Sequence, residues 1–343
     1  MSLRVEPTRP LGLFTENPTP RLYDAVIESL RVRHYSRRTE EAYVHWIRRF
    51  IEFHQHRHPR QLAEVEVNQF LTSLAVKDHV AASTQNQALS AILFLYEHVL
   101  EQPLDRIEGV VRARRPKRLP VVLTVDEVSR VMAHLTGDRW LIAMLLYGGG
   151  LRLLEALRLR IKDLDFERGE ITVREGKGDK DRVTTMPRAV VHPLLAHLRR
   201  VQAIHQQDVA DGYGRVELPH ALARKYPNAN REWAWQFVLP QERRWRNAKT
   251  GEQGRHHIDE SLFSRSLKTA VRQAGLTKRV TSHTFRHSFA THLLADGYDI
   301  RTVQELLGHK DVRTTMIYTH VLNRGGRGVR SPADGLAHDR DER

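Results

Sequence analysis

The chain has 343 residues, a length that suggests two domains. Its 55 Lys and Arg exceed its 41 Asp and Glu, and the net charge of +14 favours a polyanionic partner, nucleic acid first and an anionic membrane surface second. The absence of cysteine excludes disulfides, thiolate zinc sites and cysteine nucleophiles, and no apolar run approaches the ~18 residues of a membrane span. We therefore expect a soluble, cytoplasmic and nucleoid-associated protein.

The sequence of the first part of the chain indicates a flexible arm followed by an all-α domain. Residues 1–20 hold four of the fourteen prolines and no hydrophobic periodicity, so they indicate an arm and not a secretory signal. Between residues 21 and 105, apolar residues recur at helical spacing in four segments, and Ser36 and Ser83 are the expected caps of two of them. Arg37 and Arg38, together with 85–87, are candidate DNA contacts, the alternative being an ordinary solvated face.

A basic linker is predicted over residues 106–120. The stretch 106–118 contains six basic residues and one acid, with prolines nearby, which suits an extended strand that follows a phosphate backbone. The alternative is an ordinary exposed linker. The candidate DNA contacts here are Arg114, Arg115, Lys117 and Arg118.

The second domain, 121–330, is predicted to be α+β and mostly helical, so that the whole chain is mainly α. It opens at Thr124 with a capping box, and an apolar helix over 140–147 ends at three glycines before Arg152 begins the next helix. Strands over 170–175 and 182–186 are joined by a turn that contains Lys177, and a helix follows over 190–207. Residues 331–343 are predicted to form a disordered tail.

The stretch from His283 to Tyr318 concentrates residues able to act on a phosphate. His283 and Arg286 are three apart, so they share one face of a helix. Gly308 is expected in the left-handed conformation at a helix end, which directs His309 out of that end. Arginine, histidine and tyrosine converging in a basic protein suggest a phosphate attacked by a phenolate.

These motifs resemble the signature of the tyrosine recombinases, the phage-integrase family. The matching segments are His-x-x-Arg-His at 283–287, Leu-Gly-His at 307–309 and the following Tyr318, with Gly-Leu-Arg at 150–152 and Gly-Lys-Gly at 176–178. The resemblance implies a SAM-like core-binding domain over 21–105, a catalytic domain over 121–330, and DNA cleavage through a 3′-phosphotyrosine. Neither a metal, a cofactor nor ATP is implied.

The resemblance also implies roles for six residues. Arg152 and Arg286 would clamp the phosphate through paired donors, and Tyr318 would be the nucleophile. Lys177 would protonate the leaving 5′ oxygen, while His283 and His309 would donate to the phosphate. Glu155 is expected either to orient Arg152 or to bind a catalytic histidine. His287 is expected to point elsewhere and be structural, and 54–58, with three histidines, to be solvated instead of binding metal.

An insert at about 212–254 resembles the element that marks integron integrases. It contains three of the five tryptophans beside a cluster of arginines. By that resemblance Trp235 stacks on a base flipped out of a folded single strand, with His256 and His257 beside the base. Trp233 and Phe237 alternate with Trp235 as in a strand, and each either packs in the core or joins the stacking.

The implied function is recombination of gene cassettes by a C-shaped clamp. The partners would be a folded single-stranded attC hairpin and a duplex attI site, bound by a homotetramer whose carboxyl-terminal segments dock in a ring. Three alternatives differ in class: a phage or Xer-type recombinase acting on duplex sites alone, a non-catalytic DNA-binding regulator, and a type IB topoisomerase.

Overall fold

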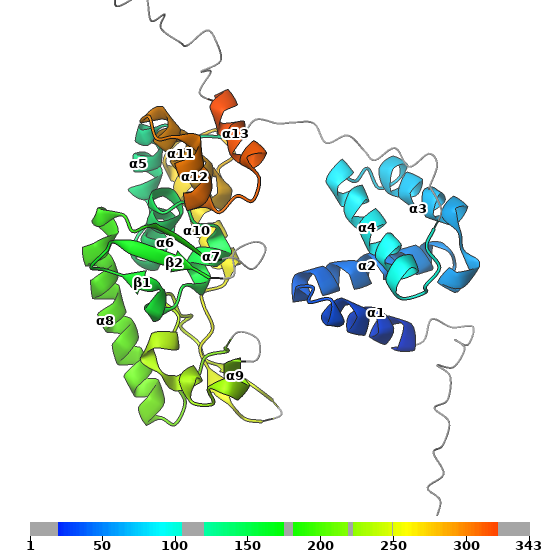
Figure 1. Ribbon diagram of the computed structural model, residues 1–343, viewed down its shortest axis with the longest axis horizontal. Coiled ribbons are helices and arrows are strands. Elements are labelled where there is room, and N and C mark those ends of the chain that lie inside the picture. The colour runs from blue at the N-terminus through cyan, green and yellow to red at the C-terminus, as the bar shows by residue number, and fades with distance from the viewer. Residues whose placement is uncertain (1–19, 105–119, 175–180, 219–221, 249, 322–343) are drawn as a thin grey trace, which may run out of the picture. The chain divides into compact units, whose positions relative to one another are not determined.

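The computed structural model describes residues 20–104, 120–174, 181–218, 222–248 and 250–321. The chain divides into two compact units, Met1–Lys117 and Arg118–Arg343 (Figure 1). The flexible arm, the basic linker with its four candidate DNA contacts, the Lys177 turn and the tail therefore lie wholly or almost wholly outside the described residues, and Lys177 itself is among those not described. No helix in the described part is long and apolar enough to cross a membrane.

The first unit is a four-helix domain. Its helices are α1 (Pro20–Val32), α2 (Arg37–Phe53), α3 (Glu64–Val76) and α4 (Ala82–His98). Their apolar faces meet in one core in which Phe50, Phe70 and Tyr96 are almost fully buried, and the Tyr96 hydroxyl donates to the Pro59 and Leu62 carbonyls at 2.8 and 3.0 Å. Burying this much aromatic surface is what holds so small a domain together.

Two details of this unit correct the sequence predictions. Ser36 does cap α2, its hydroxyl accepting from the Thr39 amide at 3.2 Å, but α4 begins after Ala81, so Ser83 lies inside the first turn and is not the cap. His54 is buried, not solvated, and its ring contacts the Glu66 carbonyl at 3.0 Å. Among the described residues no histidine and carboxylate cluster could hold a metal ion.

The second unit packs helices around a small sheet. The helices are α5 (Val125–Met132), α6 (Gly137–Gly148), α7 (Leu153–Arg158), α8 (Arg188–Ala210), α10 (Glu260–Gln273), α11 (Ser282–Ala295), α12 (Ile300–Leu307) and α13 (Val312–Val321). Strands β1 (Leu164–Asp165), β2 (Glu170–Val173) and β3 (Arg182–Thr185) pair antiparallel in that order. Ile171 and Val173 are buried in the core, which confirms the strand predicted from the alternation of apolar residues there. Strand β1 was not predicted.

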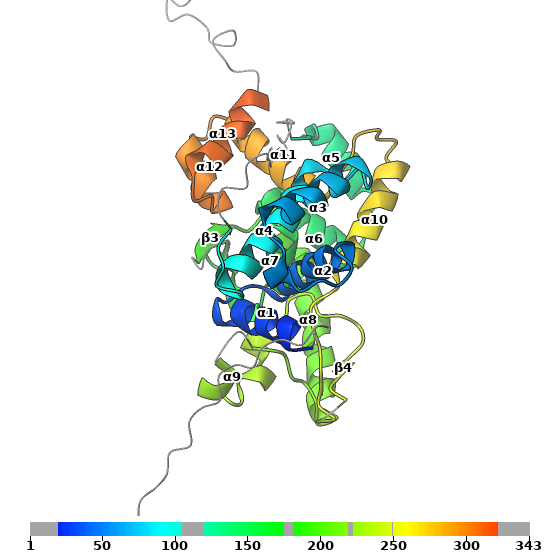
Figure 2. The ribbon, with the colours of Figure 1, turned by 90° about the vertical axis from the view of Figure 1, so that its right-hand side faces the viewer.

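The insert is less regular than its sequence suggested. In its described residues, the stretch 218–231 contains the short α9 (Leu222–Lys225) and a 3-10 turn at Ala229–Arg231. Trp233–Trp235 forms another 3-10 turn, so the strand expected from its aromatic alternation is wrong. A two-stranded ribbon follows, β4 (Trp245–Arg246) with β5 (Gln253–Gly254). Both ribbon views place α9 at the opposite end of this unit from α12 and α13 (Figures 1 and 2).

Candidate active site

A glycine turn between α6 and α7 places the first arginine. Gly150 has a φ of +63°, and a Cβ there would lie 2.4 Å from the Phe289 ring, so no other residue fits without a shift. Arg152 then occupies the cap position of α7. The turn therefore fixes the Arg152 backbone against α11 while its side chain stays partly open to solvent.

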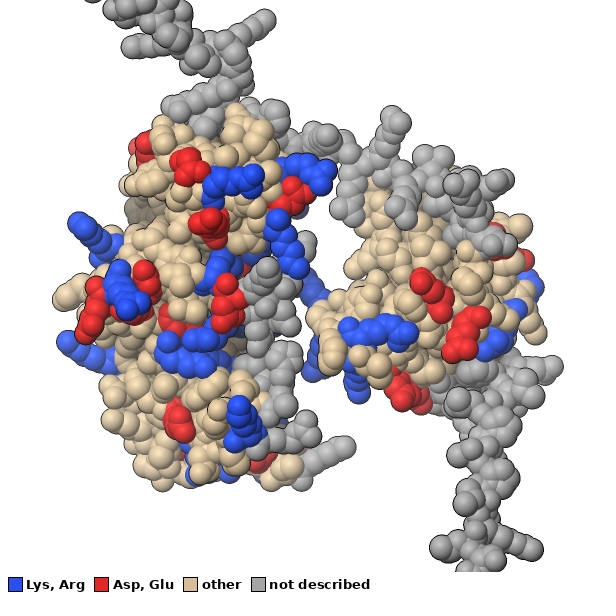
Figure 3. Space-filling model, viewed as in Figure 1, with Lys and Arg blue, Asp and Glu red and all other residues tan. Residues whose placement is uncertain are grey.

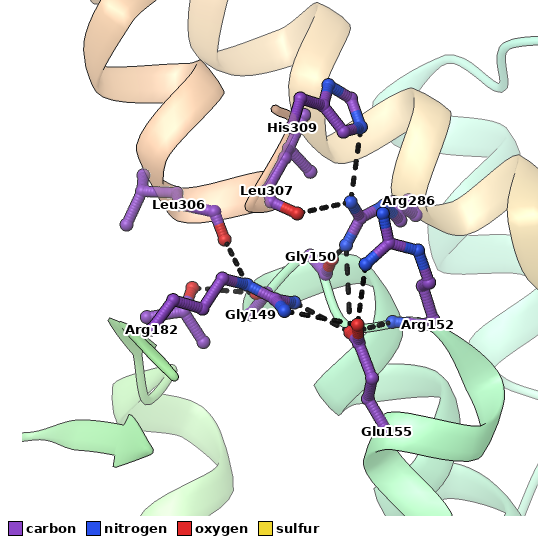
Figure 4. A network of polar contacts seen from close by, with 10 residues as sticks. Gly149, Gly150, Arg152, Glu155, Arg182, Arg286, Leu306, Leu307 and His309 are labelled. Atoms are coloured by element: carbon purple, nitrogen blue, oxygen red, sulfur yellow. Dashed lines mark hydrogen bonds and ion pairs between the residues drawn. The ribbon is translucent and has the colours of Figure 1, made fainter. Parts of the chain in front are cut away.

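Glu155 gathers three arginines around one carboxylate (Figure 4). It accepts from the Arg152 guanidinium at 2.6 Å and from both terminal nitrogens of Arg182 at 3.1 and 2.6 Å, and it lies 3.8 Å from Arg286. Burial alone would raise the pKa of Glu155, but the hydrogen bonds from Arg182 and Arg152 outweigh it and lower the pKa to about 2. Of the two roles expected for Glu155, the contact with Arg152 is the one observed.

Arg286 is buried and its side chain is held from three sides. It donates to the Gly150 carbonyl and to the Leu307 carbonyl, each at 2.5 Å, and lies 3.2 Å from His309 Nε2. Burial, helped by the Arg152 charge, lowers the pKa of Arg286 to about 9, so the group is still charged at neutral pH. These contacts fix a cation at the junction of α6, α11 and α12.

Gly308 ends α12 and directs His309 into the cluster. Its φ is +63°, the left-handed conformation predicted from the sequence, and that prediction is confirmed. His309 Nδ1 lies 3.0 Å from the Thr315 hydroxyl, while Nε2 faces Arg286. Because arginine can only donate, Nε2 must accept, which puts the imidazole proton on Nδ1. Burial, with Arg286 nearby, lowers the pKa of His309 to about 4.

Tyr318 lies on α13 and is only 3% exposed. Its hydroxyl is 3.0 Å from His287 Nδ1, and its ring stacks on that of His309 with centroids 6.3 Å apart. Burial raises the pKa of Tyr318 although Arg286 and Arg152 oppose it. His287 was expected to point away from the site. That expectation is wrong, since positions 283 and 287 are four apart on α11 and share a face.

The structure thus brings five of the six predicted catalytic residues together. Arg152, Arg286, His309 and Tyr318 form one cluster, and His283 lies exposed at its rim, with its ring centroid 6.4 Å from that of His287. The sixth, Lys177, is not among the described residues. The sequence analysis did not predict that Arg182 belongs to this cluster. Arg182 is the first residue of β3, and the local sequence there does not distinguish an arginine that points into the site from one that points to solvent.

A second feature lies beside the cluster, at the insert. A cavity of about 580 Å³ has Glu155 in its lining together with Trp235, Phe237, His256 and His257. Arg160 supports this wall: it donates to the Trp235 carbonyl at 2.6 Å and its guanidinium lies 4.5 Å from the centre of the Phe237 ring. The Trp235 ring is partly exposed, and the Lys162 ammonium lies 3.1 Å from its centre.

The other predicted DNA contacts differ in their surroundings. Trp233 is absent from the described lining of that cavity, and its ring lies 5.9 Å from that of His205 on α8. His257 is buried and donates to the Ile258 carbonyl at 2.8 Å, and burial lowers its pKa to about 4. In the first unit, Arg37 is exposed and pairs with Glu41 one turn along α2, and Arg38 is also exposed.

Comparison with known proteins identifies the class of enzyme. The model described as Phage integrase family matches residues 121–324, and the one described as Phage integrase, N-terminal SAM-like domain matches residues 22–106. The chain belongs to the phage integrase family, the tyrosine recombinases, which cut and rejoin DNA.

Individual relatives support this assignment. An integrase/recombinase of Escherichia coli is 52% identical over 316 residues, covering 92% of this chain and 94% of the relative. The tyrosine recombinase XerA of Pyrococcus furiosus is 35% identical over 257 residues, 74% of each chain. The crystal structure of the XerH site-specific recombinase bound to its difH substrate shares the fold, with a TM-score of 0.60 at 18% identity over 90% of this chain and 94% of that one.

Proposed function

We propose that this recombinase is an integron integrase, which recombines a folded single-stranded attC site with attI or with a second attC. The observation that carries the proposal is the cavity between the Glu155 cluster and the insert. Its lining includes the partly exposed Trp235 ring and the half-buried His256 imidazole, which offer surfaces that can stack on an unpaired base, beside the buried Phe237 and His257. A perfect duplex keeps its bases stacked and has no base to place there.

The partly exposed Trp235 ring is the stacking surface in this proposal. Lys162 lies over it, and burial together with the Arg174 charge lowers the pKa of Lys162. A base that stacks on this face must displace the ammonium, which is then free to pair with the phosphate of the same nucleotide. The buried Arg160, which donates to the backbone at Trp235, keeps the ring in place during that exchange.

The catalytic roles follow from the cluster. Arg152 and Arg286 clamp the non-bridging oxygens of the scissile phosphate, and Tyr318 attacks phosphorus to form the 3′-phosphotyrosine. The 5′ oxygen leaves with a proton from Lys177, and His283 donates to the phosphate. His309, whose Nε2 accepts from Arg286, holds that guanidinium toward the phosphate. The phosphotyrosine conserves the bond energy, so that a second 5′ hydroxyl can reverse the reaction. Four subunits on two DNA sites complete the exchange.

The test is covalent trapping on two substrates: an attC hairpin with extrahelical bases, and the same arms as perfect duplex. Trp235→Ala should weaken binding and trapping of the hairpin by roughly 5- to 150-fold, since stacking contributes about 1–3 kcal/mol per base, and leave the duplex unchanged. Trp233→Ala, which removes a tryptophan from outside the cavity, is the matched control.

Each outcome selects a function. A hairpin preference that depends on Trp235 supports the integron assignment. Equal trapping on the duplex selects a phage or Xer-type recombinase that acts on duplex sites. Tight binding without an adduct on either substrate, in wild type as in Tyr318→Phe, selects a DNA-binding regulator.

A further inference from the structure

The contact between Tyr318 and His287 joins two helices at the reacting atom. The tyrosine lies on α13 and the histidine on α11, and 3.0 Å separates the phenolic oxygen from Nδ1. Both side chains are at least partly buried, and their ring centroids are 5.6 Å apart. Within the described residues, His287 Nδ1 is the hydrogen-bond partner of the Tyr318 hydroxyl.

The chemistry of attack requires such a partner. A phenol has a reference pKa of ~10, and burial raises the pKa of Tyr318 further, so the hydroxyl holds its proton until the reaction. Its proton must go to an acceptor when the oxygen bonds to phosphorus. His309 is not this proton acceptor, because its Nε2 already accepts from Arg286 and its Nδ1 faces the Thr315 hydroxyl.

We propose that His287 is the general base that takes the proton of Tyr318, a role that rests on the proposed function of Tyr318 as nucleophile. The imidazole carries its own proton on Nε2, so that Nδ1 accepts. As the Tyr318 oxygen bonds to phosphorus, its O–H bond breaks and the proton passes to Nδ1, while the P–O5′ bond breaks and Lys177 protonates the leaving oxygen. In rejoining, His287 returns the proton to the departing phenolate.

The surroundings of His287 make this base depend on DNA. Burial, with the charges of His283 and Arg286 on the same helix, lowers the pKa of His287 to about 4, and His309 and Tyr318 face it from the α12–α13 side. A scissile phosphate bound to Arg286 and His283 brings a negative charge that offsets theirs. The phosphate therefore raises the basicity of His287 when the substrate is in place, and the free enzyme keeps its nucleophile protonated.

The experiment measures single-turnover formation of the covalent adduct by His287→Gln. We expect a rate about 10²-fold or more below that of wild type. The control is His292→Gln, which alters a second histidine–tyrosine pair, His292 Nδ1 on α11 with the Tyr147 hydroxyl on α6 at 2.9 Å. That variant should cleave at the wild-type rate.

Two modified reactants separate proton abstraction from other causes. A 5′-bridging phosphorothiolate leaves without a proton, so it should rescue Lys177→Ala and leave the His287→Gln defect intact. A fluorinated tyrosine at position 318, whose phenol is more acidic, should reduce the His287→Gln defect at least tenfold. Wild type should also lose activity at low pH as His287 becomes protonated, and His287→Gln should lack that limb of the profile.

Three results would overturn the proposal: a His287→Gln rate within a few-fold of wild type, rescue by the phosphorothiolate, or no gain from the fluorinated tyrosine. Rescue by the phosphorothiolate would mean that His287 acts on the leaving group. No gain from the fluorinated tyrosine would mean that His287 contributes by packing alone. An adduct that persists in Tyr318→Phe would instead refute the proposed nucleophile, and the base assignment with it, whatever the His287 variants do.

Discussion

Two of the arginine–carboxylate clusters in the described part of the catalytic unit differ in their balance of charge. Around Glu155, three guanidiniums face one carboxylate, an excess of two positive charges. Around Asp208, two guanidiniums face two carboxylates, so the charges cancel. The members of this second cluster are Asp208, Asp211, Arg244 and Arg255.

The balanced cluster is structural. Arg255 donates to Asp208 at 2.5 and 3.1 Å and to the Gln241 carbonyl, and Arg244 bridges Asp208 and Asp211 at 3.2 Å, so α8 is tied to the insert. On the face of the catalytic unit seen in Figure 3, basic and acidic side chains are likewise interspersed. In the proposed function, the phosphodiester offsets the positive excess of the unbalanced cluster. An excess of fixed cations, and not the number of arginines, distinguishes this cluster from the balanced one.

The largest expected effect comes from Arg286→Lys in the unbalanced cluster. An ammonium keeps the charge but cannot donate to Gly150, Leu307 and a phosphate oxygen in the same geometry. Adduct formation on a nicked substrate should fall by about 10²–10³-fold, with duplex affinity nearly retained because the charge remains. Arg255→Lys in the balanced cluster should change this rate by less than threefold. A similar loss of adduct formation in Arg286→Lys and Arg255→Lys would contradict the distinction between the unbalanced and the balanced cluster.

Removing the carboxylates tests the same distinction through stability. Glu155→Gln leaves three guanidiniums close together, and we expect the free energy of unfolding in urea to fall by roughly 3–5 kcal/mol. Asp208→Asn leaves Asp211 to pair with Arg244 and should cost about 1–3 kcal/mol. An Asp208→Asn loss equal to that of Glu155→Gln would show that charge excess does not matter.

Acid should weaken the catalytic cluster through its histidines before its carboxylate. The pKa values of His287 and His309 are lowered to about 4 from about 6.5, so their neutral forms stabilise the fold above pH 6.5 and that stability is lost as pH falls toward 4. Glu155, with a pKa of about 2, keeps its contribution until lower pH. Urea unfolding at pH 7.5 and 5 should show the loss, and a His287→Gln, His309→Gln double variant should lose less. The same free energy of unfolding at pH 7.5 and pH 5 in the wild type would contradict this role of the two histidines.

Sequence analysis could predict the cluster because its residues sit at fixed spacings on local elements. His283 and Arg286 share a helix face, Gly308 ends α12 in the left-handed conformation, and the four-helix first domain follows from apolar periodicity. The contacts of Arg182 could not be predicted with the same means, because they depend on where distant elements pack. The side of the helix on which His287 lies could have been, because His287 follows His283 by four residues on the same helix. The strand expected at the aromatic residues of the insert was wrong for a related reason: Trp233–Trp235 forms a 3-10 turn whose last carbonyl accepts from Arg160, 75 residues earlier.

The smallest expected effect compares two glycines with positive φ, one in the insert and one beside the unbalanced cluster. Gly251, in the turn of the insert ribbon, has a φ of +72° and open space around its Cα, whereas a Cβ on Gly308 would lie 2.6 Å from Arg182 Cδ. Alanine at either position should lower the free energy of unfolding by about 1–2 kcal/mol through backbone strain. Gly308→Ala should also slow duplex cleavage several-fold, because it displaces the guanidinium that holds Glu155 and the Leu306 carbonyl, whereas Gly251→Ala should cleave duplex at the wild-type rate. Equal cleavage by the two variants would mean that Arg182 adjusts without moving Glu155, and its part in the unbalanced cluster would then be packing alone.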